Sequence, residues 1–357
     1  MKKIILLFVI VVIISSCSRK GTPLTANEVE TKFGSSIVLV KNEYYYSVDL
    51  GGLTIYFTGL DNEGDLENVE TDLSEVKPII GYGTGFFISE DGKIATNSHV
   101  VAPPVNDRAV RNNLNQLMSA LIGAYSEEVN KLSDQINELH NYWLRTPSGS
   151  ELEASIEMKR AEIKAERDED QNILDKLRMI NTSNVTISSH SSIGIAQNNM
   201  HITSTSDFSD CVVIKDDDEH DLAILQLKNK HLPEGCTFID IEKYEEDHDN
   251  APFNADGEYI NIDEPGLGEP LYLLGYNLGP TLAITENGIK AQITEGSISQ
   301  NTDDIKVMYS IPALHGSSGA PVVDRYGNLI CINFAGLDMT QNFNYGIKAK
   351  HLRSLAK

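Results

Sequence analysis

The chain has 357 residues, of which 41% are hydrophobic, and its 52 acidic against 29 basic side chains give a formal charge of −23. This length and composition support one large domain or two smaller ones and do not indicate extensive disorder. The acidic surface argues against nucleic acid or anionic lipid headgroups as partners, because both require a basic binding face. The chain's 4 cysteines are too few for a scaffold held mainly by disulfides.

The N-terminal residues MKKIILLFVIVVIISSC contain two lysines, an apolar run from Ile4 to Ile14 and then Ser-Ser-Cys. This is the layout of a secretory signal, and the apolar run is short for a transmembrane span. The residues before Cys17 resemble a bacterial lipobox, which implies lipidation of Cys17 after removal of a signal peptide at 1–16. We therefore expect a polar tether at 17–33 and a membrane protein of the bacterial cell envelope, facing the periplasm or the cell exterior. The alternative is an uncleaved N-terminal anchor helix.

Short candidate strands separated by Gly, Asn and Asp turns dominate the rest of the chain, a pattern typical of all-β barrels and sandwiches. We therefore predict a mostly β fold. The candidate strands are, in chain order, 36–40, 54–58, 85–89, 93–97, 211–215, 223–228, 271–275, 296–300, 306–310, 321–323, 329–334 and 345–348.

One block, residues 105–180, interrupts the β pattern with apolar residues at helical spacings of three and four. A proline, a glycine and a predicted capping box from Ser148 to Glu151 divide the block into two helices. We predict an antiparallel coiled-coil hairpin, which either associates with a partner or with itself through residues 106–180, or is a tolerated surface insertion. The first apolar stripe comprises Leu121, Tyr125, Val129, Leu132, Ile136, Leu139 and Trp143, and the second comprises Leu152, Ile156, Ile163, Ile173, Leu177 and Ile180.

Three polar side chains stand at predicted strand ends on either side of this block. His99 ends a strand in GYGTGFFISEDGKIATNSHVV, Asp221 precedes one in KDDDEHDLAILQLK, and Ser318 lies in the turn LHGSSGAPVV. A nucleophilic serine needs a nearby base, and that base needs a carboxylate to hold its tautomer and stabilise its charged form. His220, beside Asp221, is a competing candidate, but in an extended segment it points to the opposite side of the strand.

These segments resemble chymotrypsin-fold serine proteases, and among them the bacterial Deg (high-temperature-requirement) branch. The resemblance lies in GTGFFISEDGKIATNSHVV, HDLAILQLK, LGEPLYLLGYNLG, ITEGSIS and GSSGAPVVDRYGNLICIN, which follow one another in the expected order. It implies two β-barrels and a serine endopeptidase that forms an acyl-enzyme with a polypeptide substrate. His99 would be the general base, Asp221 its orienting carboxylate and Ser318 the nucleophile. The order His, Asp, Ser differs from subtilisins, and too little chain follows Ser318 for an α/β-hydrolase.

The resemblance also assigns an oxyanion hole to the backbone N–H groups of Gly316 and Ser318. Small residues there allow the backbone to approach the developing negative charge. No charged side chain appears among the implied pocket residues, so we expect a small or medium apolar residue before the cut. The residues implied to line this pocket are Pro312, Ala313, Asn333, Phe334 and Ala335.

The chain also departs from the family pattern. Ser317 replaces the aspartate that pairs with a new N-terminus in relatives activated by cleavage, so we expect no zymogen cleavage. No segment after Leu355 could form a PDZ module, and we expect neither a metal nor another cofactor. The predicted organisation is a first barrel at 34–240 interrupted by the hairpin, an acidic linker at 241–264 and a second barrel at 265–357. The alternative function is a catalytically idle lipoprotein that binds a partner through its hairpin.

Overall fold

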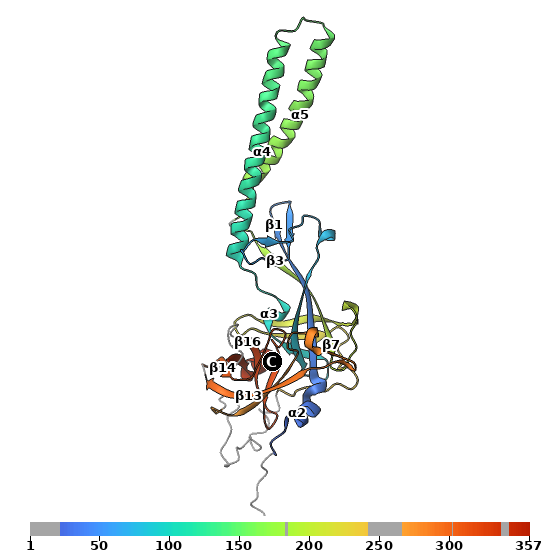
Figure 1. Cartoon of the computed structure of the whole chain (residues 1–357), viewed down its shortest axis with the longest axis vertical. Coiled ribbons are helices and arrows are strands. Elements are labelled where there is room, and N and C mark those ends of the chain that lie inside the picture. Colours follow the sequence, from blue (N-terminus) through green and yellow to red (C-terminus); the bar gives the residue numbers. More distant parts are fainter. Residues whose placement is uncertain (1–21, 183–184, 242–265, 302, 337–342) are drawn as a thin grey trace, which may run out of the picture. The chain divides into compact units, whose positions relative to one another are not determined.

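The computed structural model describes residues 22–182, 185–241, 266–301, 303–336 and 343–357 (Figure 1). The predicted signal peptide, Cys17 and nearly all of the acidic linker lie outside these residues. Within them, no helix is both long enough and apolar enough to cross a bilayer. Cys211, Cys236 and Cys331 are all free thiols.

The first barrel is a ring of six strands. They are connected in the order β1-β5-β6-β9-β8-β7, and pairing of β7 with β1 closes the ring, while β2 (Thr54–Phe57) extends the sheet beyond β1. Closure removes the exposed strand edges that an open sheet would leave. The six strands are β1 (Ile37–Asp49), β5 (Ile79–Phe87), β6 (Lys93–Thr96), β7 (Ile187–Gln197), β8 (Ser209–Asp217) and β9 (Leu222–Leu227).

The second barrel is also closed, with strand order β10-β13-β14-β17-β16-β15. The prediction of a mostly β, two-barrel chymotrypsin-like fold is therefore confirmed. One apolar core is continuous between the barrels, because Phe86 of the first packs in the same cluster as Leu274 and Val323 of the second. The strands are β10 (Pro270–Gly275), β13 (Gln292–Asn301), β14 (Lys306–Tyr309), β15 (Pro321–Asp324), β16 (Leu329–Gly336) and β17 (Asn344–Lys348).

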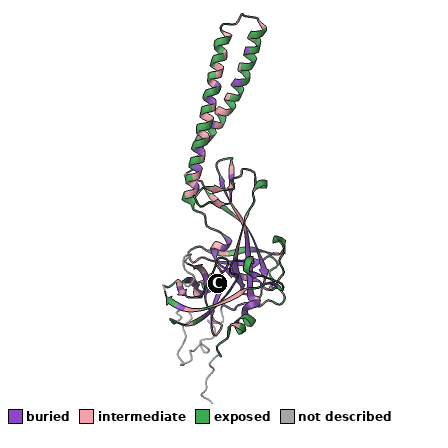
Figure 2. Cartoon of the chain, viewed as in Figure 1, coloured by how far each residue is buried: buried purple, intermediate pink, exposed green. Residues whose placement is uncertain are grey.

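The predicted two-helix hairpin is confirmed. It consists of α4 (Asp107–Trp143, 37 residues) and α5 (Glu151–Met179, 29 residues), which lie side by side (Figure 1). Both helices carry a narrow line of buried residues among exposed ones, as Figure 2 shows. Burial of one stripe is what the three-and-four spacing requires. The buried residues are Val110, Leu114, Met118, Val129 and Leu132 of α4, and Ile156, Ile163, Leu174 and Leu177 of α5.

Two details of the hairpin differ from the prediction. The N-cap of α5 is Ser150, whose hydroxyl accepts from the Glu153 N–H at 3.2 Å, and not Ser148. Both serines are followed three residues later by glutamate, so the sequence offered two equivalent boxes. Leu152 is 61% exposed and lies outside the buried stripe of α5, whose first buried residue is Ile156.

Of the short helices that were not predicted, two are 8 residues long. The expected irregular tether contains α2 (Ala26–Phe33), which has a Thr25–Glu28 capping box and buries Val29 and Phe33. With only 8 residues, it is too short to show a helical period in the sequence. The second is α8 (Ala349–Ala356), in which Leu352 is fully buried.

The chain divides into two compact units. The described residues within 1–43, 80–103 and 191–357 form the unit that contains most of both barrels. The other unit, residues 44–79 and 104–190, has its own core, in which Tyr46, Val48 and Phe57 pack with Val110 and Leu114 of α4. The hairpin thus shares a hydrophobic core with the C-terminal half of β1 and with β2. The remaining elements are α3 (Ser98–Val101), α7 (Pro280–Ala283), β3 (Gly59–Leu60), β4 (Leu66–Glu67), β11 (Ile284–Thr285) and β12 (Gly288–Ile289).

Candidate active site

His99 lies on α3, the single helical turn that follows β6. Val100 and Val101 of this turn are buried in the core of the first barrel. The preceding residue is also held in place by a hydrogen bond, because Ser98 Oγ donates to Asp218 Oδ1 at 2.9 Å. Burial on one side of α3 fixes the backbone from which the His99 ring projects.

Two N–H groups of His99 contact the Asp221 carboxylate. The His99 ring atom Nδ1 lies 2.8 Å from Asp221 Oδ2, and the His99 backbone N–H donates to Oδ1 at 3.0 Å. Asp221 itself has a φ of 52°, which is strained for a residue with a Cβ, and its carbonyl accepts from Asn97 Nδ2 at 2.8 Å. With Nδ1 donating to the carboxylate, Nε2 of His99 is left as a proton acceptor.

Ser318 is held against the first barrel through Thr84 of β5. The Thr84 N–H donates to the Ser318 carbonyl at 2.8 Å, and its hydroxyl donates to the Gly316 carbonyl at 2.8 Å. Thr96, at the end of β6 and three residues before His99, donates its hydroxyl to the Thr84 carbonyl at 2.7 Å. One buried threonine therefore connects the backbone of the Ser318 turn to the strand that leads to His99.

The Ser318 hydroxyl and the His99 ring are not joined by a hydrogen bond between described residues. The structure brings His99 and Asp221 into direct contact and places Ser318 on the neighbouring turn. Catalytic hydrogen bonds are often long in the absence of substrate and shorten when it binds.

The turn before Ser318 has backbone N–H groups without an acceptor among the described residues. Ser317 donates its N–H to the Leu314 carbonyl at 3.0 Å and Gly319 donates to the Asn333 carbonyl at 2.8 Å, but no described residue accepts from Gly316 or Ser318. Two such free donors are what an oxyanion hole requires. Gly316 has a φ of 94°, and a Cβ there would lie 2.5 Å from the Tyr276 carbonyl oxygen. Only glycine fits this position.

A buried network of hydrogen-bonded side chains supports the turn that contains Ser318. Ser317 is 1% exposed, its hydroxyl donates to the Leu314 carbonyl at 2.6 Å, and Asn333 Nδ2 donates to its carbonyl at 3.0 Å. Tyr309 donates its hydroxyl to Asn333 Oδ1 at 2.7 Å, and complete burial holds the pKa of Tyr309 well above its usual value. Neither Thr84 nor Tyr309 was identified from sequence, although Thr84 was visible as a polar residue inside a glycine-rich apolar strand.

The residues expected to line the specificity pocket have different environments. Pro312 is exposed, whereas Ala313 and Phe334 are partly buried and Ala335 lies on β16 opposite Tyr345. The side chain of Asn333 is occupied by the internal network, and its backbone N–H donates to the Ala320 carbonyl at 2.9 Å, so neither is available to a substrate pocket. Lys306 Nζ lies 4.9 Å from the centroid of the Phe334 ring, which places a cation beside a pocket predicted from sequence to be uncharged.

His220 belongs to a separate pair. Its Nδ1 lies 2.7 Å from Asp217 Oδ2, and its ring stacks on His351 with centroids 4.1 Å apart. It therefore makes no contact with the Asp221 carboxylate in the described hydrogen bonds. Among the described residues, no cluster of histidine, cysteine and acidic side chains has an arrangement able to hold a metal ion.

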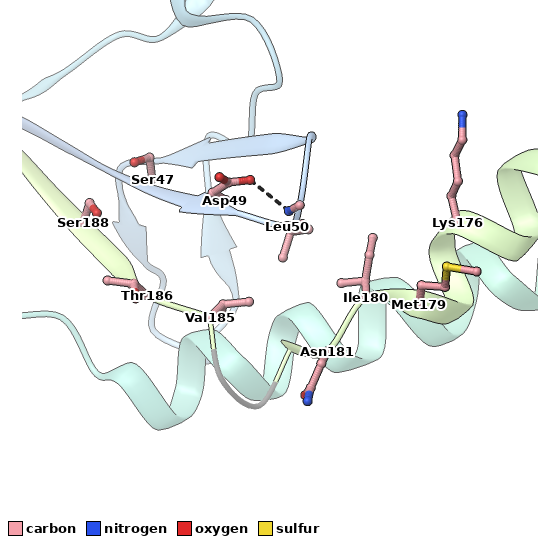
Figure 3. A pocket seen from close by; sticks show the side chains of 11 residues that line it. Ser47, Asp49, Leu50, Lys176, Met179, Ile180, Asn181, Val185, Thr186 and Ser188 are labelled. Atoms are coloured by element: carbon pink, nitrogen blue, oxygen red, sulfur yellow. Dashed lines mark hydrogen bonds between the residues drawn. The ribbon is translucent and has the colours of Figure 1, made fainter.

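A cavity of about 680 Å³ lies in the unit that contains the hairpin (Figure 3). Ser47, Asp49, Lys176 and Ser188 contribute polar groups to its lining, and Asp49 is engaged by the Gly51 N–H at 2.9 Å. None of its lining residues is a predicted site residue. The cavity is therefore separate from the candidate active site.

Comparison with known proteins identifies the family that part of the chain resembles. Residues 175–332 match the family model described as a trypsin-like peptidase domain. The predicted resemblance to chymotrypsin-fold serine proteases is confirmed over this range. The matched range contains Asp221 and Ser318, whereas His99 precedes it, on the other side of the hairpin in the sequence.

The individual proteins that are similar to this chain include a curated relative and a solved structure. An uncharacterized protein of Sinorhizobium fredii, y4bJ, is 26% identical over 151 residues, covering 35% of this chain and 24% of that protein. The chain thus spans about a quarter of the length of that curated relative. The crystal structure of a serine endoprotease from Yersinia pestis aligns with 94% of this chain and 66% of its own, at 14% identity and a TM-score of 0.41.

Proposed function

We propose that the protein is a membrane-anchored serine endopeptidase that hydrolyses polypeptides through an acyl-enzyme. The observation that carries the proposal is the His99–Asp221 contact, in which Nδ1 meets the carboxylate and leaves Nε2 free. The Thr84 contacts of the Ser318 turn and the free N–H groups of Gly316 and Ser318 support the same assignment.

The proposed reaction begins when Ser318 Oγ attacks the scissile carbonyl and His99 Nε2 takes the hydroxyl proton. The Gly316 and Ser318 N–H groups donate to the oxyanion, while Asp221 stabilises the imidazolium. His99 then returns the proton to the leaving amine as the C–N bond breaks. Water then attacks the acyl carbonyl while His99 Nε2 takes a proton from it. His99 returns this proton to Ser318 Oγ as the ester C–O bond breaks, which releases the acid and regenerates the serine.

The direct test is labelling with a fluorophosphonate probe, which phosphonylates an activated serine. The full-length protein should be labelled at Ser318 and should cleave a denatured protein substrate, whereas Ser318→Ala should do neither. Unlabelled wild-type protein that has the correct fold by circular dichroism would contradict the proposal.

Substrate preference and anchoring extend this proposal. We expect cleavage after small or medium apolar residues, because the pocket side chains Ala313 and Phe334 are apolar. Dominant cleavage after Arg, Lys or Glu in a peptide library would contradict this expectation. For the anchor at Cys17, metabolic labelling with a clickable fatty acid should modify wild type and not Cys17→Ser. Equal labelling of both would remove the lipid anchor and, with it, the proposed location in the cell envelope.

The second candidate function is a catalytically idle protein that binds a partner through the hairpin. Its support is the lack of a hydrogen bond between Ser318 and His99 in the described residues, together with the long exposed faces of α4 and α5. The labelling experiment separates the two candidates. Self-association through residues 106–180 predicts that deletion of the hairpin lowers the mass measured by light scattering below that expected for loss of its own residues.

A further inference from the structure

The direction of a backbone N–H group is set by the carbonyl of the residue before it. A trans peptide group is planar, so its N–H points away from its C=O. The described residues contain no cis peptide bond. A hydrogen bond that holds the His315 carbonyl therefore directs the Gly316 N–H to the opposite side of the peptide. A hydrogen bond to the Ser317 carbonyl directs the Ser318 N–H in the same way.

Asn333 of β16 holds the carbonyl that directs the Ser318 donor. Its Nδ2 donates to the Ser317 carbonyl at 3.0 Å. Because a carbonyl can only accept, the NH₂ end of the Asn333 amide must face Ser317. Tyr309 of β14 donates its hydroxyl to the other end, Asn333 Oδ1, at 2.7 Å. Asn333 and Tyr309 are 2% and 0% exposed, so water does not compete for these hydrogen bonds.

The segment that follows β10 holds the carbonyl that directs the Gly316 donor. The Leu278 N–H donates to the His315 carbonyl at 2.6 Å. Leu278 has a φ of 55°, which is strained for a residue with a Cβ, so other contacts must hold the segment in place. Asn277 supplies one of them, because its Oδ1 accepts from the Leu314 N–H at 2.8 Å and its side chain is buried.

The same segment is anchored on its other sides. The Asn277 N–H donates to Gln292 Oε1 at 2.8 Å, and Gln292 Nε2 donates to two backbone carbonyls at 2.9 and 3.3 Å. The Tyr276 N–H donates at 2.9 Å to Thr84 Oγ1, the hydroxyl that holds the Gly316 carbonyl. Residues 276–278 thus form an ordered support that contacts the turn one peptide group after another.

We infer that Asn277 and Asn333 are positioning residues that aim the two proposed oxyanion donors at the oxyanion. Asn333 acts on the Ser318 N–H through the carbonyl of Ser317, and Asn277 acts on the Gly316 N–H through the segment that contains Leu278. The inference rests on the proposed endopeptidase function and adds residues that support its reaction. The two asparagines act in opposite senses, because Asn277 accepts a hydrogen bond from the turn and Asn333 donates one to it.

Matched substitutions in the full-length protein test the two roles. Asn333→Leu and Asn277→Leu keep the size of the side chain and remove its hydrogen-bonding groups, so each should lower kcat by about 10- to 100-fold. Asn277→Asp keeps an acceptor oxygen for the Leu314 N–H and should retain kcat within about threefold of wild type. The KM should change by less than about threefold in all three variants, because the donors act mainly in the transition state.

Asn328→Leu is the matched control for loss of an asparagine hydrogen bond in the second barrel. Asn328 Nδ2 donates to Asp324 Oδ2 at 2.8 Å, and the described hydrogen bonds of Asn328 all join it to Asp324. This variant should have a lower melting temperature and a kcat within about threefold of wild type. A loss of kcat as large as in Asn277→Leu and Asn333→Leu would attribute the effect to destabilisation and overturn the inference.

Binding of a peptide boronic acid gives a readout that destabilisation alone would not change. The Ser318 hydroxyl adds to boron, His99 takes the proton, and an oxygen of the tetrahedral adduct occupies the oxyanion site. The same peptide with a C-terminal amide binds without forming an adduct. The two Leu variants should bind the boronic acid about 10- to 100-fold more weakly than wild type and the amide within about threefold. An equal change for both ligands would contradict the positioning role.

Fluorophosphonate labelling of wild type separates failure of the inference from failure of the proposed function. A labelled wild type with folded Leu variants that keep kcat, or with equal losses in Asn277→Asp and Asn277→Leu, would overturn the inference and leave the peptidase intact. Tyr309→Phe keeps the ring and decides the role of Asn333 if Asn333→Leu does not fold. Its kcat should fall by about fivefold or more, and an unchanged kcat would count against Asn333. An unlabelled wild type would overturn the peptidase function and the inference with it.

Discussion

Two histidine–aspartate pairs meet at the turn that precedes β9, and their geometries are nearly the same. His99 Nδ1 lies 2.8 Å from Asp221 Oδ2, and His220 Nδ1 lies 2.7 Å from Asp217 Oδ2. All four side chains are partly exposed, between 21% and 35%. A short N–O distance therefore does not by itself distinguish the proposed catalytic pair from the other pair.

The surroundings of each ring make the difference. His99 follows the strand that Thr96 and Thr84 connect to the turn of Ser318, the proposed nucleophile. The His220 ring is covered by His351 of α8. A histidine acts as a general base only if the nitrogen opposite its carboxylate has access to the reacting hydroxyl. The comparison yields four predictions.

The largest effect is expected from removing each histidine in turn. His99→Ala should lower kcat by roughly 10⁴-fold or more, because Ser318 loses its base. His220→Ala should change kcat by less than about threefold, since its ring serves packing. Initial rates on a peptide substrate, normalised to folded protein, measure both. Similar losses for the two variants would show that the pairs were assigned wrongly.

Replacing Asp221 should also lower kcat more than replacing Asp217, although the two variants should differ less than the two histidine variants do. Asp221→Asn is expected to lower kcat by about 10⁴-fold, because an amide favours the wrong imidazole tautomer. Asp217→Asn keeps the volume and hydrogen-bonding atoms beside His220 and should leave kcat within about threefold. Measuring both variants from pH 6 to 9 tests the tautomer explanation. An Asp221→Asn enzyme with nearly full activity would contradict it.

Gly316→Ala tests the turn itself. The new Cβ would lie 2.5 Å from the Tyr276 oxygen, so the turn must shift and its N–H groups must move away from the oxyanion. We expect a loss of about 10²–10³-fold in kcat together with a lower melting temperature. Gly235→Ala is a control for the left-handed conformation alone, since Gly235 has a φ of 79° but open space around it. If Gly316→Ala had no larger effect on kcat than the control, the proposed oxyanion hole would be wrong.

The smallest effect concerns the stacked histidines and pH. Burial lowers the pKa of His351 below its ordinary value, Asp304 opposes this shift, and His220 and Lys350 add to it. The unfolded chain then binds the proton more readily, so stability falls as the pH drops through the unfolded value of about 6.5.

Replacing His351 should weaken this pH dependence. We expect the melting temperature of wild type to fall more between pH 7.5 and 5.5 than that of His351→Gln, by no more than about 2 °C. His231→Gln, at an exposed position, should retain the wild-type slope. An unchanged slope in His351→Gln would show that His351 does not contribute to it.

Local sequence patterns were enough to find much of the fold. Alternating strands and turns predicted a mostly β fold, and three-and-four spacing predicted the hairpin, because both periodicities are imposed by the geometry of the backbone itself. The two barrels were implied by the resemblance to chymotrypsin-fold proteases. The order of His99, Asp221 and Ser318 at strand ends identified the candidate site. Where two local signals were equivalent, as at Ser148 and Ser150, the sequence alone did not decide between them.

The tertiary structure decided which polar groups support the site. Thr84 donates to Gly316, 232 positions away, Tyr309 and Asn333 meet within the second barrel, and the Tyr82 and Phe208 rings lie with centroids 6.4 Å apart. The tertiary structure also decided between His99 and His220, since only contacts with distant residues distinguish these two histidines. Such contacts depend on how closed sheets bring separate strands together, and no periodicity along the chain records which strands become neighbours. The sequence by itself determined the elements and the chemical groups at their ends, and the folded barrels determined which of those groups could act together.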